Sequence, residues 1–134
     1  RPPDITGVED PEYPMDMDIM MGALGAEVLD WSFKTTCCGA GHALSRPDIV
    51  VDLSANLVQG AIDVGADAIA VACPLCHMNL DARQFQMEIE RPMPIMYFTQ
   101  LIAIALDLPP KAAALNKNIV DPRPMLLEKG LIKT

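Results

Sequence analysis

The four cysteines of this chain stand in two close pairs, and its 134 residues contain no other cysteine. Cys37 and Cys38 are adjacent, whereas two residues separate Cys73 from Cys76. Adjacent side chains diverge from Cα atoms about 3.8 Å apart, which suits ligands of different metal atoms better than a relaxed disulfide. Cys-x-x-Cys spacing lets two sulfurs converge on one metal or cluster, or forms a redox dithiol. Each pair follows an apolar run typical of a strand, so we expect the fold to bring two strand ends to one site.

The length and charge of the chain limit the class of protein that it can be. A single domain of this length buries about two thirds of its unfolded surface, so it does not need disulfides in order to fold. The net charge of −8 argues against nucleic-acid binding, which needs clustered Lys and Arg. The apolar stretch at residues 101–106 is far too short to span a membrane. A soluble, acidic domain is therefore expected.

The start of the sequence bears on the compartment. Arg1 stands first rather than Met, and no apolar export signal follows it. We expect a cytoplasmic protein, in which thiols stay reduced and clustered cysteines serve metal or redox chemistry. We also expect the chain to be the C-terminal part of a longer protein.

Apolar periodicity predicts alternating helices and strands. Met17, Met20, Met21 and Leu24 recur at helical spacing as a packing face, and the continuous apolar run at 67–72 is typical of a buried parallel strand. Helices are predicted at about 17–24, 46–64, 79–90 and 99–106, and strands at about 27–33, 67–72 and 95–98. This order predicts an α/β fold with a mainly parallel sheet and helices on both faces, a Rossmann-like arrangement.

The predicted fold places both cysteine pairs beyond the carboxyl ends of strands, where ligands of open α/β sheets bind. Helix N-termini point to the same edge, and their dipoles stabilise thiolates and anionic clusters. Gly39 and Gly41 fit a backbone that wraps closely around a bound group, because they carry no Cβ. We expect all four cysteines to gather there around a common cofactor.

The cysteine motifs resemble those of a known family. Residues 37–42 read CCGAGH and residues 73–81 read CPLCHMNLD. These segments closely resemble the cysteine-rich CCG domain of the B-type subunit of heterodisulfide reductase and its relatives, and the resemblance covers most of the chain. The NLD continuation at 79–81 is more similar to the B-type subunit than to the lactate- or glycolate-oxidising iron–sulfur subunits that share the domain. On this basis we divide the chain into a CCG domain at 1–110 and a C-terminal tail at 111–134, expected to pack along the surface or to contact a neighbouring chain.

The resemblance implies a cofactor and partners. It implies that Cys37, Cys38, Cys73 and Cys76, with a fifth cysteine further upstream, bind a non-cubane [4Fe-4S] cluster in the full-length protein. It also implies an oxidoreductase that acts on a disulfide substrate and receives electrons from the other heterodisulfide reductase subunits, an iron–sulfur subunit of the C type and a flavin-containing subunit of the A type. Since no cysteine precedes Cys37, we expect the isolated fragment to be inactive and either free of metal or zinc-bound.

Other interpretations of the cysteines remain open. The same four thiolates suit a structural zinc module, although an adjacent pair is awkward for one ion. Cys73 and Cys76 alone suit a thioredoxin-like dithiol, and disulfide staples are a further interpretation. An iron–sulfur electron-transfer subunit of a lactate-, glycolate- or succinate-oxidising complex is the alternative within the family.

Several polar residues lie near the cysteines in sequence. His42 and His77 are the only histidines, and each lies within four residues of a cysteine. Either histidine can donate to a cluster sulfur or supply a proton to a leaving thiolate, or it can simply face solvent or stabilise a loop. Asp81, Arg83 and Gln84 are interpreted as a solvated helix face without chemistry.

Overall fold

The computed structural model describes residues 5, 7, 10 and 12–133. The Pro, Asp and Gly content of residues 1–11 predicts a loop, and this prediction falls mostly outside the described residues. In chain order the elements are α2 (Asp16–Ala23), η1 (Ala40–His42), α3 (Pro47–Asp63), β1 (Ile69–Val71), α4 (Pro74–Ala82), η2 (Gln84–Gln86), β2 (Ile95–Tyr97), α5 (Phe98–Ala105), α6 (Pro110–Ala113), η3 (Leu115–Lys117) and α7 (Arg123–Glu128).

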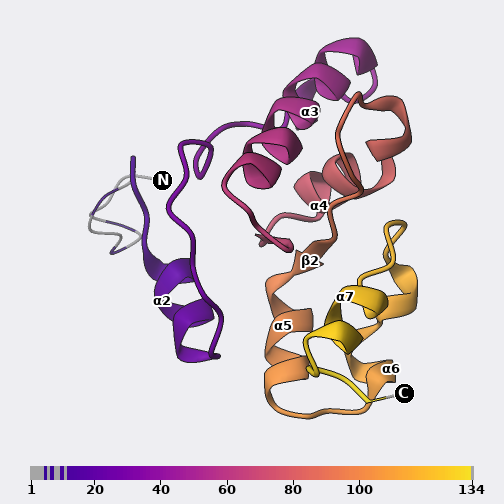
Figure 1. Ribbon diagram of the computed structural model, residues 1–134. Helices are drawn as coiled ribbons and strands as arrows, with labels where there is room; N and C mark the ends of the chain where they lie inside the picture. The colour runs from indigo at the N-terminus through magenta and orange to yellow at the C-terminus, as the bar shows by residue number, and fades with distance from the viewer. Residues whose placement is uncertain (1–4, 6, 8–9, 11, 134) are drawn as a thin grey trace.

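The centre of the fold is a small parallel sheet. β1 and β2 pair in parallel, with Ile69 opposite Ile95 and Val71 opposite Tyr97. The chain between them passes through α4, because parallel strands cannot be joined by a tight turn and need a crossover. Figure 1 shows β2 running directly into α5 at the middle of the molecule. The predicted parallel α/β arrangement is confirmed, with a sheet of two strands.

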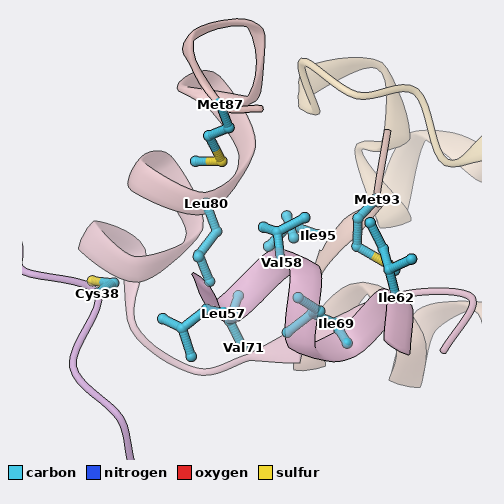
Figure 2. Close-up of a cluster of buried hydrophobic side chains, with 11 residues drawn as sticks. Cys38, Leu57, Val58, Ile62, Ile69, Val71, Leu80, Met87, Met93 and Ile95 are labelled. Carbon is cyan, nitrogen blue, oxygen red and sulfur yellow. The ribbon is translucent and has the colours of Figure 1, made fainter. Parts of the chain in front are cut away.

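Helices cover both faces of this sheet. Side chains alternate between the two faces along a strand. Ile69, Val71 and Ile95 pack with residues of α3 and α4 in one buried cluster, drawn in Figure 2. On the other face Met96 packs with residues of α5, α6 and α7 in a second cluster formed by Met96, Ala103, Ala113, Leu115 and Leu126. The C-terminal tail thus contributes buried side chains to the second cluster.

Helix α3 confirms the prediction at 46–64 to within one residue at each end. Pro47 occupies its first turn, where a missing N–H costs nothing. Val50, Ser54, Leu57, Val58 and Ala61 are buried along one face, at the spacing of an amphipathic helix. The helix stops just before Gly65, which adopts a positive φ of 78°.

The strand predicted at 27–33 is wrong. Residues 27–31 have no regular structure and residues 32–35 form a turn. A strand needs a neighbouring strand to satisfy its backbone. Here the aromatic side chains of Trp31 and Phe33 pack instead against the cluster around α3, and the Phe33 ring lies so close to Gly60 that an added Cβ would be 2.5 Å away.

The helix predicted at 79–90 is wrong in its bounds. It begins at Pro74, with the extended Cys73 as its N-cap, and ends at Ala82. The Gln84 side chain stops it by bonding both the last turn of α4 and a later segment: Nε2 donates to the carbonyl oxygens of Leu80 at 2.9 Å and Met93 at 2.7 Å, and Oε1 accepts from the Met93 N–H at 2.9 Å. The earlier start places both Cys73 and Cys76 in the first turn of α4.

The helix predicted at 17–24 is confirmed as α2. Of its methionine stripe only Met21 is fully buried, while Met17 and Met20 are not. Figure 1 shows α2 to one side of the helices that cover the sheet. Within the described residues, none of the helices combines the length and the apolar character needed to traverse a bilayer.

Candidate cysteine site

One sulfur from each cysteine pair meets the other across the fold. The Cys38 and Cys76 Sγ atoms are 3.4 Å apart, although 38 positions separate the two residues in sequence. Cys38 comes from the loop before η1 and is only 2% exposed, whereas Cys76 is half-buried in the first turn of α4. Figure 2 shows Cys38 at the end of the buried cluster, next to α4. All four cysteines are free thiols.

Cys73 lies at the N-terminus of α4 and is exposed. Backbone N–H groups of Cys76 and Leu75, which have no partner within the helix, point at its sulfur and lower the pKa of the Cys73 thiol. The neighbouring Cys76 thiol lowers the pKa further. The backbone around Cys73 therefore favours the thiolate form of this cysteine.

The environment of Cys76 has the opposite effect. Burial, followed by the nearby Cys38 and Cys73 sulfurs, raises the pKa of the Cys76 thiol to about 12. Without a cation this thiol stays protonated at neutral pH. A bound metal would reverse that preference, because its positive charge stabilises the thiolate.

The backbone turns at Gly39, directly after Cys37 and Cys38. Gly39 has a positive φ of 81°, a conformation that glycine adopts without steric cost. Cys37 is exposed, and its sulfur accepts a hydrogen bond from the Gly39 N–H at 3.3 Å. Among the described residues, no group of three or more His, Cys, Asp or Glu side chains is arranged to hold a metal ion. The structure brings together the sulfurs of Cys38 and Cys76, and the Cys73 sulfur lies beside that of Cys76.

Two residues that sequence reasoning did not assign to the site lie next to it, Asn79 in α4 and Arg83 directly after α4. Asn79 is completely buried, and its Nδ2 lies 3.7 Å from the Cys38 sulfur. Arg83 Nε donates to Asn79 Oδ1 at 3.2 Å. Cys76, Asn79 and Arg83 follow at i, i+3 and i+7, so a helix predicted from Pro74 onward would have revealed their common face.

The solvated face predicted for Asp81, Arg83 and Gln84 is wrong. Asp81 is 3% exposed and Gln84 is 7% exposed, and Arg83 is half-buried. The Asp81 carboxylate accepts hydrogen bonds from the backbone N–H groups of Ile119 at 2.6 Å and Val120 at 2.9 Å. These side chains bond backbone groups of other segments, a task that periodicity alone does not reveal.

The two histidines have different surroundings. His42 is exposed at the end of η1. His77 is half-buried, with Nε2 3.2 Å from the Ile95 carbonyl oxygen and 3.3 Å from Asn118 Nδ2. Its ring also lies beside Tyr97, with centroids 5.8 Å apart. His77 thus faces β2, on a different side of α4 from Asn79.

Comparison with known proteins identifies the family. The family model described as "CCG: Cysteine-rich domain" matches residues 5–81, which include both cysteine pairs. This chain belongs to the CCG cysteine-rich domain family. The resemblance based on residues 37–42 and 73–81 is thereby confirmed.

Several curated relatives are similar to this CCG domain. A Wolinella succinogenes protein named as the membrane anchor of 8-methylmenaquinol:fumarate reductase is 29% identical over 126 residues, which cover 90% of this chain and 44% of that protein. The B-type subunit of the ferredoxin:CoB-CoM heterodisulfide reductase of Methanosarcina mazei is 29% identical over 119 residues, covering 83% of this chain and 39% of the relative. An Archaeoglobus profundus protein, named as similar to the same heterodisulfide reductase subunit, is 28% identical over 116 residues, which cover 79% of this chain and 38% of that protein. The chain spans about two fifths of the length of these relatives.

Proposed function

We propose that this CCG domain supplies thiolate ligands to an iron–sulfur cluster in an oxidoreductase similar to the B-type subunit of heterodisulfide reductase. The observation that carries the proposal is the 3.4 Å approach of the Cys38 and Cys76 sulfurs, which joins the two cysteine motifs. Thiolates are the ligands that iron–sulfur clusters use. Bound there, a non-cubane [4Fe-4S] cluster would supply the one-electron steps that disulfide cleavage requires.

The protein groups around the cysteines have distinct tasks in this proposal. Cys73 provides a thiolate that the amides of α4 stabilise before any metal arrives. Cys38 and Cys76 provide sulfurs shielded from water by the core cluster. Cys37, which is exposed, is the fourth proposed ligand. A fifth thiolate has to come from outside these 134 residues, because they contain four cysteines.

We further propose that the substrate is a disulfide and that partner subunits deliver the electrons. The relatives named as heterodisulfide reductase subunits support this substrate class. An iron–sulfur subunit of the C type and a flavin-containing subunit of the A type are the proposed partners, since a cysteine-rich domain alone needs an electron source.

The histidines are the proposed proton sources for a departing thiolate. His42 is the stronger candidate, because it is exposed and close in sequence to the Cys37–Cys38 pair. His77 is the weaker candidate for that task, since its Nε2 is engaged by the Ile95 carbonyl oxygen.

A second candidate function is electron transfer within a complex that acts on a dicarboxylate. The Wolinella fumarate reductase protein matches a larger share of this chain, at the same identity, than the heterodisulfide reductase protein of M. mazei. The two functions share the proposed cluster and differ in the reaction of the assembled complex. Release of thiols from a disulfide, measured against reduction of fumarate, distinguishes them.

Iron analysis tests the proposed function. The protein that contains this chain, purified without oxygen, should carry iron and acid-labile sulfide. Cys38→Ser should remove most of that iron, because a buried thiolate that the cluster needs is lost. Ser45→Ala, a change at an exposed residue of the loop before α3, serves as the control and should keep full iron content. Full iron content and an unchanged spectrum in Cys38→Ser would show that Cys38 is not a ligand.

A further inference from the structure

The amide of Asn79 is the one polar side-chain group other than a thiol that the described residues place at the Cys38 sulfur. Asn79 Nδ2 lies 3.7 Å from Cys38 Sγ, within the longer range of hydrogen bonds to sulfur. Both residues are buried, at 0% and 2% exposed. Water therefore does not compete for this contact, and a polar group in such surroundings interacts more strongly than it would at the surface.

The contact with Arg83 fixes which way the Asn79 amide points. Arg83 Nε donates to Asn79 Oδ1 at 3.2 Å, and a guanidinium group can only donate. The oxygen of the amide must face the cation, so its N–H₂ group must face the sulfur. The opposite orientation would set two donors against each other on the side of the guanidinium.

Arg83 also connects α4 to the segment that carries Cys38. Its Nη2 donates to the Ala43 carbonyl oxygen at 3.3 Å, just after η1. The guanidinium charge draws electron density from Asn79 Oδ1 and makes the N–H₂ group a better donor. A cation thereby acts on the sulfur through a neutral amide, without coming into contact with it.

We propose that Asn79, oriented by Arg83, is a positioning residue that donates a hydrogen bond to the Cys38 sulfur and stabilises negative charge on it. This inference rests on the proposed function, because the negative charge that matters is that of a metal-bound thiolate. Hydrogen bonds to cluster sulfurs stabilise the more negative, reduced state. The Asn79 amide should therefore raise the reduction potential of a bound cluster.

The first experiment needs no cluster. In the reduced, metal-free 134-residue chain, the side-chain N–H₂ signals of Asn79 in a ¹H–¹⁵N spectrum should shift on Cys38→Ala and keep their positions on Cys37→Ala. They should also shift on Arg83→Met, which releases the amide oxygen. Signals that respond to neither Cys38→Ala nor Arg83→Met would overturn the hydrogen bond.

The second experiment measures potential in the cluster-loaded protein that contains this chain. Asn79→Leu keeps the branched shape of the side chain and removes the donor, so the midpoint potential should fall while iron content stays the same. Arg83→Met should lower it by a smaller amount, and Asn56→Leu, at an exposed position of α3, should not change it. If Asn79→Leu does not fold, the midpoint potential of Arg83→Met tests the proposed role of the Asn79 amide.

The two failures are distinguishable. Wild-type protein without iron would contradict the proposed function, and the spectra of the metal-free chain would still test the hydrogen bond. Iron-loaded protein whose potential is the same in wild type, Asn79→Leu and Arg83→Met would overturn the inference and leave the proposed function standing.

Discussion

Gly39 follows a pair of cysteines of which Cys37 is exposed and Cys38 is buried. Its φ of 81° lies in the left-handed region, and an ideal Cβ would lie 3.0 Å from Leu53 Cδ1 and 3.4 Å from Val50 Cα. Both contacts are with α3, which leaves little room for the loop to move away. The residue that follows the two cysteines is thus constrained both by its backbone torsion and by its packing against α3.

Gly39→Ala should destabilise the chain by about 1–2 kcal/mol, because alanine is strained at positive φ and crowds α3. Chemical denaturation of the metal-free chain measures this loss. Gly41→Ala is the matched control, because an added Cβ there meets no atom within 4 Å and its φ is not positive. Equal unfolding free energies for the two variants would contradict the role given to Gly39.

The thiols of Cys73 and Cys76 should differ in their response to pH. The pKa of Cys73 is lowered by the amides of α4, whereas the pKa of Cys76 is raised to about 12, chiefly by burial. In the metal-free, reduced chain, iodoacetamide should label Cys73 at a lower pH than an ordinary thiol and leave Cys76 unmodified at mildly alkaline pH. Mass mapping of labelled peptides checks this order, and chain unfolded in urea is the control. Equal labelling of both residues in the folded chain at that pH would refute it.

The raised pKa of Cys76 also predicts how the free energy of unfolding depends on pH. The folded thiol keeps its proton to about pH 12, while the unfolded thiol loses it near the ordinary value of 9.0. Between these values the folded state binds more protons, so the free energy of unfolding should fall as pH rises. Urea titrations at several alkaline pH values measure the slope, and Cys76→Ala should reduce it. An identical slope in that variant would contradict the shift.

Among the elements, α4 links the cysteine site to the C-terminal tail. One of its faces carries Cys76, Asn79 and Arg83 toward the Cys38 loop, and another carries His77 and Asp81 toward β2 and residues 118–120. Asn118 joins this second face, since its Nδ2 donates to the Ile95 carbonyl oxygen at 2.6 Å. Movement of the C-terminal tail would therefore also displace α4, at whose N-terminus Cys73 and Cys76 lie.

Asp81→Ala should cost about 1–2 kcal/mol of stability, because the Ile119 and Val120 N–H groups lose a buried acceptor. Denaturant unfolding provides the measurement. Asp52→Ala removes a carboxylate from an exposed position of α3 and should change little. If both variants lost the same free energy, the carboxylate of Asp81 would not be holding the tail.

Elements with a strong local signal could be predicted from the sequence, and those that depend on distant partners could not. The periodicity and Gly65 identify α3, and the short apolar run identifies β1, because these signals lie within the elements. The segment at 27–33 alternates like a strand, but whether it pairs depends on a neighbour that its own residues do not specify. The end of α4 likewise depends on Met93, nine positions after Gln84.

The same distinction holds at the candidate site. The spacing of Cys37, Cys38, Cys73 and Cys76 is a local pattern, and it is enough to predict that the two pairs meet, although only the second pair follows a strand. Asn79 could not be predicted, because its place at the Cys38 sulfur depends on where α4 begins and on how it packs. A buried asparagine and an exposed one look the same in a sequence.

On the scale of the whole molecule, stability comes from two apolar clusters on opposite faces of one small sheet. The first cluster includes Leu57, Val58 and Ile95, and the second is centred on Met96 and Leu126. Of the cysteines, only Cys38 is a fully buried member, and it packs at the edge of the first cluster. The core is thus formed mainly by side chains that do not bind metal.

Thermal unfolding of the 134-residue chain should therefore be cooperative, with the same midpoint in the presence and absence of a strong chelator. A structural zinc site would behave differently, since metal binding there supplies the free energy of folding. Circular dichroism against temperature provides the measurement, and a zinc-finger peptide serves as the positive control. Loss of the folded state on chelation would favour the zinc interpretation of the cysteines.

The 38 positions that separate Cys38 from Cys76 have a consequence during synthesis of the chain. Cys38 is added to the growing chain 38 residues before its spatial neighbour Cys76, whereas Cys73 and Cys76 are added almost together. Closing a short loop costs little entropy, so a disulfide between Cys73 and Cys76 is favoured over any disulfide to Cys38 until α4 has packed. A cell that makes this protein has to keep the nascent thiols reduced for that interval, since oxidation would join two cysteines that are free thiols in the folded chain.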